Sequence, residues 1–369
     1  AQLAFNLWQE MTLGWKQALM DKIDKRFSFF TSSKLLPLLV QSALYSFWRA
    51  QQACMRLYLP IPLGMWREIH QLFRYAAENR LLDEKKSDNP KEKSGRSIST
   101  LYKQQLLLAL ADPQRFSGAE LDKVIEIIES YAHYAHFQPV SKLASAAGFF
   151  LIELEHDKAP QFIGNRSLDV LPPHSLLLDT IELAKKLHKA EVNVESKAPM
   201  ANDRAKVQMW LEILRRVIRQ WCISPQRLYQ RIPAESTVDV VLGLSQAVMQ
   251  LNSEHLSPAA LAKHYGEVTL MPWRVINESP GGYAIVAHDL PSEQARPGEI
   301  VVLRASSESA WMVASIRWLQ QRYDGATEMG LQVMSAKAQP VLLRPTVASN
   351  TLFQPALLLP PIPALKQQQ

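Results

Sequence analysis

The sequence from Trp273 to Ala287 reads Trp-Arg-Val-Ile-Asn-Glu-Ser-Pro-Gly-Gly-Tyr-Ala-Ile-Val-Ala. Branched and aromatic residues on both sides of Pro280-Gly-Gly indicate two strands joined by a tight turn. We therefore predict strands at residues 267–276 and 283–287. Because their connection is so short, the two strands are expected to pair antiparallel.

Four more segments after residue 225 are short, rich in β-branched residues and separated by turn residues such as Arg296-Pro-Gly and Asp324-Gly. Strands at roughly ten-residue spacing are typical of a small antiparallel β-barrel. Residues 245–265 interrupt the series as a helical insertion. The proline-rich tail, 346–369, is expected to lie outside any core. The further strands expected are residues 238–244, 299–304, 311–319 and 328–334.

Residues 1–221 instead carry apolar side chains at three- and four-residue spacing, which predicts helices. The charged segment 83–96 is expected to be a solvated, mobile loop. Residues 148–155, Gly-Phe-Phe-Leu-Ile-Glu-Leu-Glu, break the trend and predict a strand. The fold class is therefore α+β, with a mostly α-helical N-terminal domain (1–221) followed by a small antiparallel β-barrel (222–345). The expected helices are residues 35–59, 66–77, 106–110, a helix opening at Ser117, 176–187 and 205–221.

Composition supports two differently built domains. The 369 residues are long for one domain, and 47% hydrophobic with 21% charged residues is ordinary for a globular protein. That composition excludes a disordered or fibrous chain. Only 13 glycines are present, 6 of them before residue 221 and 7 after it. The low glycine content of the longer first part favours helix.

Several features predict a cytoplasmic protein. Cys54 and Cys222 are too few for a disulfide framework, which suits a reducing compartment. No stretch reaches the roughly eighteen apolar residues that a membrane span needs. The N-terminus does not read as a signal peptide, because charged residues are scattered through 21–26.

The net charge indicates which classes of ligand the protein can bind. The chain has 41 basic and 35 acidic residues, a net charge of +6. That excess permits an anionic ligand but falls short of the basic stripe of a nucleic-acid-binding protein. No nucleic acid partner is expected.

Two short motifs carry candidate chemistry. Asn277-Glu-Ser279-Pro-Gly-Gly282 follows a predicted strand, so Asn277 and Ser279 can bond local backbone or a polar ligand, and Gly282 lets a main chain approach closely. A plain hairpin turn explains the same residues. Upstream, Arg227 and Arg231 are four residues apart at the junction of helix and barrel, and face the same side. Two guanidinium forks can bind phosphate oxygens and stack on purine faces.

An Arg-x-x-x-Arg segment leading into a small barrel, followed by Asn-x-Ser-x-x-Gly at a strand turn, resembles the PilZ family. The later strands, from Pro297-Gly-Glu to Met334, are similar to the second half of that domain. The resemblance covers about residues 222–345. PilZ domains are bacterial receptors for cyclic di-GMP, and the resemblance implies a cyclic di-GMP receptor and effector in signalling, without catalytic activity and without a cofactor.

By the same resemblance, Arg227 and Arg231 would hold the phosphates and guanine faces of the ligand. Asn277, Ser279 and Gly282 would form the opposing wall. The interval between the two motifs is longer than usual for the family because of the insertion 245–265. That insertion leaves three roles open: a cap over the site, a partner-binding element, or a sign of a degenerate domain.

The resemblance suggests motility, surface attachment (biofilm) or polysaccharide production as pathways. Ligand bound at the linker 222–233 would rearrange the two domains, and the helical domain would bind a partner protein. The alternative is a PilZ-like barrel with a degenerate site that acts as a constitutive adaptor. It predicts that Arg231→Ala changes stability alone.

Two other clusters are weaker candidates. His133 and His136, three apart on a predicted helix ending near Phe137, permit metal ligation, but no third or fourth ligand accompanies them. We expect no metal. The acidic cluster at 153–157, which includes Glu153, Glu155, His156 and Asp157, offers an acid–base pair for an enzyme. A solvated strand end explains that cluster more simply.

Overall fold

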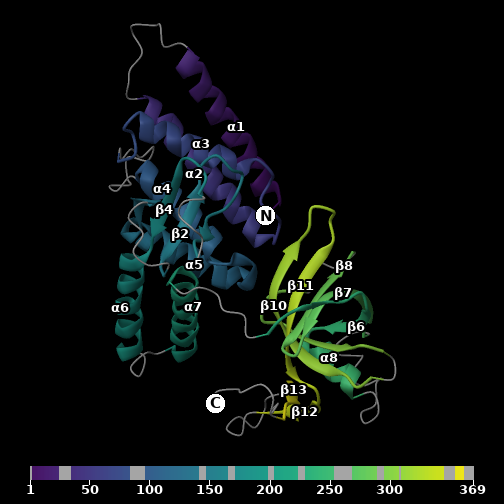
Figure 1. Cartoon of the computed structure of the whole chain (residues 1–369). Coiled ribbons are helices and arrows are strands. Elements are labelled where there is room, and N and C mark those ends of the chain that lie inside the picture. The colour runs from purple at the N-terminus through teal and green to yellow at the C-terminus, as the bar shows by residue number, and fades with distance from the viewer. Residues whose placement is uncertain are drawn as a thin grey trace. The chain divides into compact units, whose positions relative to one another are not determined.

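The computed structural model describes residues 2–24, 35–83, 96–140, 147–164, 171–197, 203–222, 229–252, 268–288, 295–306, 309–344 and 354–360. The chain divides into two compact units (Figure 1), the main break falling between Gln226 and Arg227. The predicted loop 83–96 lies outside the described residues except at its two ends. Each unit is described separately below.

The first unit is built mainly of helices, as predicted. The helices expected at 35–59, 66–77 and 205–221 are confirmed, and the one opening at Ser117 begins at Gly118. The helix expected at 106–110 is longer, and an N-terminal helix was not predicted. The helices are α1 (Gln2–Asp24), α2 (Leu35–Arg56), α3 (Met65–Glu78), α4 (Ile98–Leu110), α5 (Gly118–Tyr131), α6 (Ile181–Lys197) and α7 (Arg204–Cys222), with short 3-10 turns at Pro113–Arg115 and Ala132–Tyr134.

The first unit also contains a four-stranded antiparallel sheet, in the order β1 (His136–Pro139), β4 (Ser175–Asp179), β2 (Phe149–Glu153), β3 (Gln161–Phe162). The predicted strand 148–155 is confirmed as β2. The predicted helix 176–187 is wrong over its first residues, because Leu176 to Leu178 form β4 between β1 and β2. A short leucine run fits a buried strand as well as a helix, and only strand pairing decides between them.

Helix α3 is attached to the turn after β2 by polar contacts. The Asp157 carboxylate accepts hydrogen bonds from the backbone N–H groups of Gly64 (2.5 Å) and Arg67 (3.1 Å), at the N-terminus of α3. His70 on α3 lies 2.7 Å from the Tyr102 hydroxyl and 2.9 Å from the Lys158 carbonyl. The contacts of Asp157 and Lys158 with α3 join residues about ninety positions apart in sequence.

The second unit is a closed barrel of six antiparallel strands, in the order β7-β6-β9-β10-β11-β8, with β7 also pairing with β8. A short strand, β5 (Ile232–Pro233), lies along the free end of β7. All six predicted strands are confirmed. They are β6 (Thr237–Leu242), β7 (Met271–Ser279), β8 (Gly282–Ala287), β9 (Ile300–Arg304), β10 (Met312–Gln321) and β11 (Thr327–Ser335).

One face of β6, β9 and β10 is covered by a helix and by part of the C-terminal tail. Helix α8 (Leu244–Leu251) and strand β13 (Gln354–Leu358), which pairs with β12 (Gln339–Leu343), pack over a cluster that includes Val241, Val302 and Val313 (Figure 1). The tail was expected outside any core. That prediction is wrong for Leu357 and Leu359, which pack on the cluster, because proline is compatible with the edge strands that form this small sheet.

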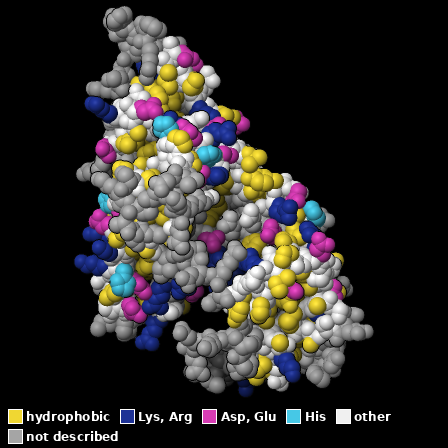
Figure 2. Space-filling view, viewed as in Figure 1, with side chains coloured by type: hydrophobic (Ala, Val, Ile, Leu, Met, Phe, Trp, Pro, Cys, Tyr) yellow, Lys and Arg dark blue, Asp and Glu magenta, His cyan; other side chains and the backbone are white. Residues whose placement is uncertain are grey.

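Positive and negative side chains are interspersed over the face of the helical unit in Figure 2. This pattern agrees with the modest net charge of +6 and differs from the single-sign stripe of a nucleic-acid interface. None of the helices in the described part of the chain is long and apolar enough to cross a bilayer.

The buried His70 makes the stability of the first unit depend on pH. The Lys158 carbonyl can only accept, so Nε2 carries the proton and neutral Nδ1 accepts from Tyr102. Burial, opposed by the Lys158 bond and Asp157, lowers the pKa of His70 below its ordinary 6.5. Just below about pH 6.5, His70 is therefore protonated more in the unfolded state than in the folded state. The stability that neutral His70 contributes to the folded state above that pH is lost as the pH falls.

We expect the free energy of unfolding to fall between pH 7.5 and 5.5 with a contribution from this residue of at most about 1.4 kcal/mol per pH unit. His70→Gln should be less stable at pH 7.5 but have a flatter pH dependence, measured by urea unfolding at both pH values. His188→Gln, at an exposed position, is the control. Equal pH slopes in His70→Gln and the wild type would contradict this assignment.

Candidate functional site

The turn between β7 and β8 carries the Asn-x-Ser-x-x-Gly motif. Ser279 and Gly282 are the last paired residues of the hairpin, and Pro280-Gly281 forms the two-residue loop. The Ser279 hydroxyl donates to the Gly282 carbonyl (3.3 Å). Strand β11 holds the loop from the other side, since the Val333 N–H donates to the Gly281 carbonyl (3.1 Å). The predicted hairpin is therefore confirmed, and its turn is fixed by backbone contacts.

Gly282 is required by its surroundings. Its φ of +153° lies outside the range that side chains favour, and a Cβ atom there would overlap the carbonyl oxygen of Leu331. The backbone of β8 thus approaches β11 more closely than any residue with a side chain allows. The close approach of a main chain that the sequence predicted at Gly282 is confirmed, and the approaching main chain is that of β11.

The second arginine of the Arg-x-x-x-Arg segment, Arg231, lies beside this turn. Strand β5 pairs with β7 through Ile232 opposite Glu278 and Pro233 opposite Asn277. Continued by one residue, this antiparallel register places Arg231 opposite Ser279. Arg231 of the first motif and Ser279 of the second, about fifty residues apart in sequence, thus lie on neighbouring strands at one end of β7. Arg231 is exposed there, and Arg227 lies outside the described residues.

Tyr229, midway between the two arginines, lies against the same turn. Its ring atoms Cδ2 and Cε2 would be 3.1 and 3.3 Å from a Cβ atom added to Gly281, so the ring covers the bare backbone of that glycine. Tyr229 is 37% exposed, which leaves part of the ring open to solvent. Sequence analysis missed this residue, although an aromatic residue between two arginines was a usable signal.

A β-bulge precedes Asn277. The register between β7 and β8 shifts between Val275 and Asn277, after which Asn277 pairs with Ala284. Bulges re-aim the residues that follow them and are frequent next to functional sites. Beyond the bulge, Asn277 and Ser279 share one face of β7, the alternation that the site requires.

The opposite face of β7 carries a carboxylate. Glu278 pairs with Tyr283 across the hairpin, and burial together with the Glu278 charge raises the pKa of the Tyr283 hydroxyl. Because Glu278 alternates with Asn277 and Ser279, its charge points away from their face. An anionic ligand on the Asn277–Ser279 face therefore avoids this carboxylate.

The histidine pair does not form the geometry expected of it. Helix α5 ends at Tyr131, so the prediction that both histidines lie on one helix is wrong: His133 is in a 3-10 turn and His136 begins β1. His136 Nε2 lies 2.8 Å from Glu182, and the His133 ring contacts the Tyr134 ring in a tilted arrangement, with 4.0 Å between centroids. No group of three metal-ligating side chains is found among the described residues.

The cluster after β2 joins the sheet to α3. Glu153, 9% exposed, pairs with Lys158 (3.3 Å) and His156 (3.2 Å). Asp157 caps α3, and Glu155 lies 3.5 Å from Arg74 of the same helix. Each of these carboxylates has a partner that fixes the turn, so the cluster is explained by structural contacts.

A closed six-stranded barrel that carries Asn-x-Ser-x-x-Gly at its β7–β8 turn, with Arg231 next to that turn, is the arrangement of a PilZ domain protein. The family described as "Cyclic-di-GMP receptor FimW, middle PilZ domain" matches residues 149–257 and 249–340, and its "N-terminal domain" counterpart matches residues 1–142. The chain belongs to this FimW family. The cyclic-di-GMP receptor FimW of Pseudomonas aeruginosa is 22% identical, over 100% of this chain and 70% of the relative.

These matches confirm the PilZ resemblance and extend it. The middle-domain match begins at residue 149, the first residue of β2, whereas the sequence analysis placed the resemblance at 222–345. The middle-domain match therefore includes three strands of the sheet in the first unit, β2, β3 and β4, as well as the barrel, whereas β1 lies within the N-terminal match. The predicted α+β fold class is also confirmed.

Because Gly282 lies so close to Leu331, we expect a methyl group added at Gly282 to lower the stability of the barrel strongly. Gly282→Ala should destabilise the barrel by about 3 kcal/mol or more, because a backbone carbonyl cannot move aside as a side chain can. Gly325→Ala, also at positive φ (+83°) but with nothing within 4 Å of the added carbon, should cost only about 1–2 kcal/mol. Urea unfolding followed by tryptophan fluorescence measures both. Equal losses would show that backbone strain, rather than the clash, governs Gly282.

Proposed function

We propose that this protein is a receptor for cyclic di-GMP, with the ligand bound between Arg227 and Arg231 on one side and the turn of Asn277, Ser279 and Gly282 on the other. The observation that carries the proposal is the pairing of β5 with β7, which brings Arg231 beside the turn. Membership of the FimW family, which is described as a family of cyclic-di-GMP receptors, supports the choice of ligand.

The chemistry of the corner suits a dinucleotide with two phosphates and two purines. Guanidinium groups bind phosphate oxygens through paired N–H donors and stack on purine rings. The Asn277 amide and Ser279 hydroxyl offer donors and acceptors for a guanine edge. The partly exposed Tyr229 ring provides a further stacking surface. All of these roles are binding roles, so the protein acts as an effector without catalytic activity and needs no cofactor.

Calorimetric titration of cyclic di-GMP into the purified chain tests this site. The wild type should bind saturably. Arg231→Ala and Arg227→Ala should each weaken binding about 10- to 100-fold, since each removes a charged, bidentate contact worth about 1.5–3 kcal/mol. Asn277→Ala should weaken it about fivefold or more, the loss expected for a neutral hydrogen bond.

Arg322→Ala is the matched control for charge. Arg322 follows β10, at the Thr327 end of β11, whereas Gly282 pairs with Gln332 at the other end of that strand. Its loss should leave the affinity unchanged. An absence of binding in the wild type would instead support the alternative, a constitutive adaptor with a degenerate site, for which Arg231→Ala alters stability alone.

The position of the two arginines suggests how binding is transmitted. They lie in the segment 222–233, which connects α7 to the barrel strand β5. A ligand held by this segment and by the barrel would fix a connection between the two units. The finer proposal is that ligand binding changes the relative orientation of the units and thereby controls a partner protein bound by the helical unit.

Small-angle scattering tests the rearrangement. We expect the radius of gyration and pair-distance distribution of the wild type to change at saturating cyclic di-GMP, and those of Arg231→Ala to remain at their ligand-free values. Superimposable curves for free and saturated wild type would rule out the rearrangement while leaving the binding site intact.

A further inference from the structure

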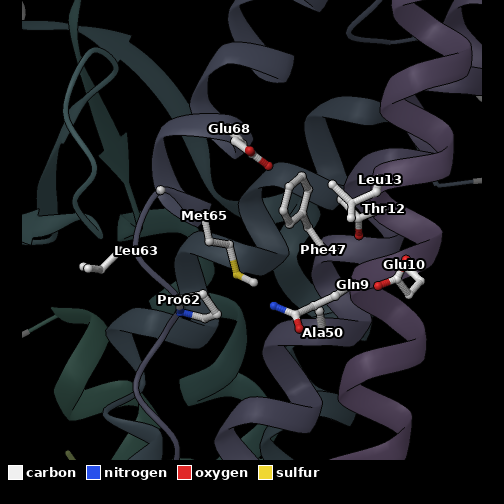
Figure 3. Close-up of a pocket in the computed structure, with 11 residues that line it drawn as sticks. Gln9, Glu10, Thr12, Leu13, Phe47, Ala50, Pro62, Leu63, Met65 and Glu68 are labelled. Atoms are coloured by element: carbon white, nitrogen blue, oxygen red, sulfur yellow. The ribbon is translucent and has the colours of Figure 1, made fainter. Parts of the chain in front are cut away.

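A groove in the helical unit has an apolar floor and an acidic rim (Figure 3). It is a space of about 270 Å³ lined by α1, α2, the following loop and the start of α3. Phe47, Ala50 and Met65, all at most 5% exposed, form part of the floor. Glu10 and Glu68 lie at its rim. Figure 3 shows the Met65 sulfur and the Phe47 ring around the open space.

Two leucines on the rim are unusually open to solvent. Leu63 is 82% exposed and Leu13 is 55% exposed. The loop that carries Leu63 is nevertheless fixed: Asp157 binds the Gly64 N–H, and the Met65 N–H donates to the Pro62 carbonyl (3.2 Å). Figure 3 shows the Leu63 side chain at the edge of the groove, directed away from Met65 and Phe47. Because its backbone is already fixed, the leucine can pack on a bound partner without a backbone ordering cost.

Size and charge together select the occupant. The volume of the groove lies below the roughly 300–1,000 Å³ of pockets that bind drug-sized ligands. A bulky nucleotide therefore fits the groove poorly, whereas one or two side chains of a partner fit it well. The carboxylates of Glu10 and Glu68 repel an anion and favour a cation. Lys16 pairs with Glu68 at 2.7 Å, which leaves Glu10, exposed on α1, as the more accessible charge.

We propose that this groove binds a partner protein through a basic peptide segment with an apolar anchor. A leucine or similar side chain of the segment occupies the floor between Leu13 and Leu63, and a neighbouring lysine or arginine lies against Glu10. Burial of apolar anchors in a groove, with charges at the rim, is a general mode of peptide recognition. The inference deepens the proposed receptor function by stating the chemistry of its partner.

A pair of synthetic probes tests the groove in the full-length chain without cyclic di-GMP. One is a fluorescein-labelled amphipathic peptide with leucines on one face and arginines on the other; the second has glutamates in place of the arginines. We expect saturable binding of the arginine probe by fluorescence anisotropy, and at least about tenfold weaker binding of the glutamate probe.

Matched variants test whether the arginine probe binds in the groove. Leu13→Asp and Leu63→Asp should each weaken the arginine probe about tenfold, and Glu10→Lys should weaken it more at low salt than at high salt. Leu7→Asp is the control, because Leu7 is on the same helix and 56% exposed but does not line the groove. Circular dichroism checks that each variant is folded.

Three outcomes would overturn the proposal: no binding of the arginine probe, equal binding of both probes, or equal weakening by Leu7→Asp and Leu13→Asp. A lower sedimenting mass in Leu13→Asp than in the wild type would identify a second copy of the chain as the occupant and also overturn it. Because no nucleotide is present, these failures are distinguishable from a failure of cyclic di-GMP binding, which the calorimetric titration measures separately.

Discussion

Strand β7 is the constraint on which the second unit depends, because it pairs with three other strands. Its pairing with β6 and β8 closes the barrel, and its free end holds β5. A shift of one residue in this register would turn Asn277 and Ser279 to the other face. It would also move Arg231 away from the turn. Barrel closure and assembly of the candidate ligand site therefore follow from one set of backbone hydrogen bonds.

The first unit depends on a comparable long-range attachment, made by polar groups. The turn after β2 supplies Asp157 to cap α3 and the Lys158 carbonyl to bind His70. Buried polar groups are stabilising only when their partners are in place. The turn thus fixes both the sheet against α3 and the loop that presents Leu63. The same residues, viewed as a local sequence, resembled an acid–base pair.

The sequence predicted the barrel better than the sheet of the first unit, for a physical reason. Barrel strands of five to ten residues show alternation and turn residues, whereas β1, β3 and β4 are short and β4 is a leucine run. Only pairing with neighbours distinguishes such a run from a helix. Likewise, the motif of Arg227 and Arg231 could be found in the sequence, but the contact of Tyr229 with Gly281 could not, because it depends on the β5–β7 register. The packing of Leu357 on the barrel could not be predicted either, because it depends on the pairing of β13 with β12.

The two proposed sites differ in charge, and this difference has a consequence for signalling. Arg227 and Arg231 would favour an anion and repel a basic peptide, whereas the accessible carboxylate of Glu10 favours a basic peptide and repels an anion. Cyclic di-GMP and the partner segment therefore do not compete for one site. Any influence of one on the other must pass through a change in the protein, and by linkage it must be reciprocal: if the nucleotide strengthens peptide binding, the peptide strengthens nucleotide binding by the same factor. A receptor built as we propose would report the nucleotide through its conformation, and the connecting segment that carries the arginines would then matter more to its output than the chemistry of either site alone.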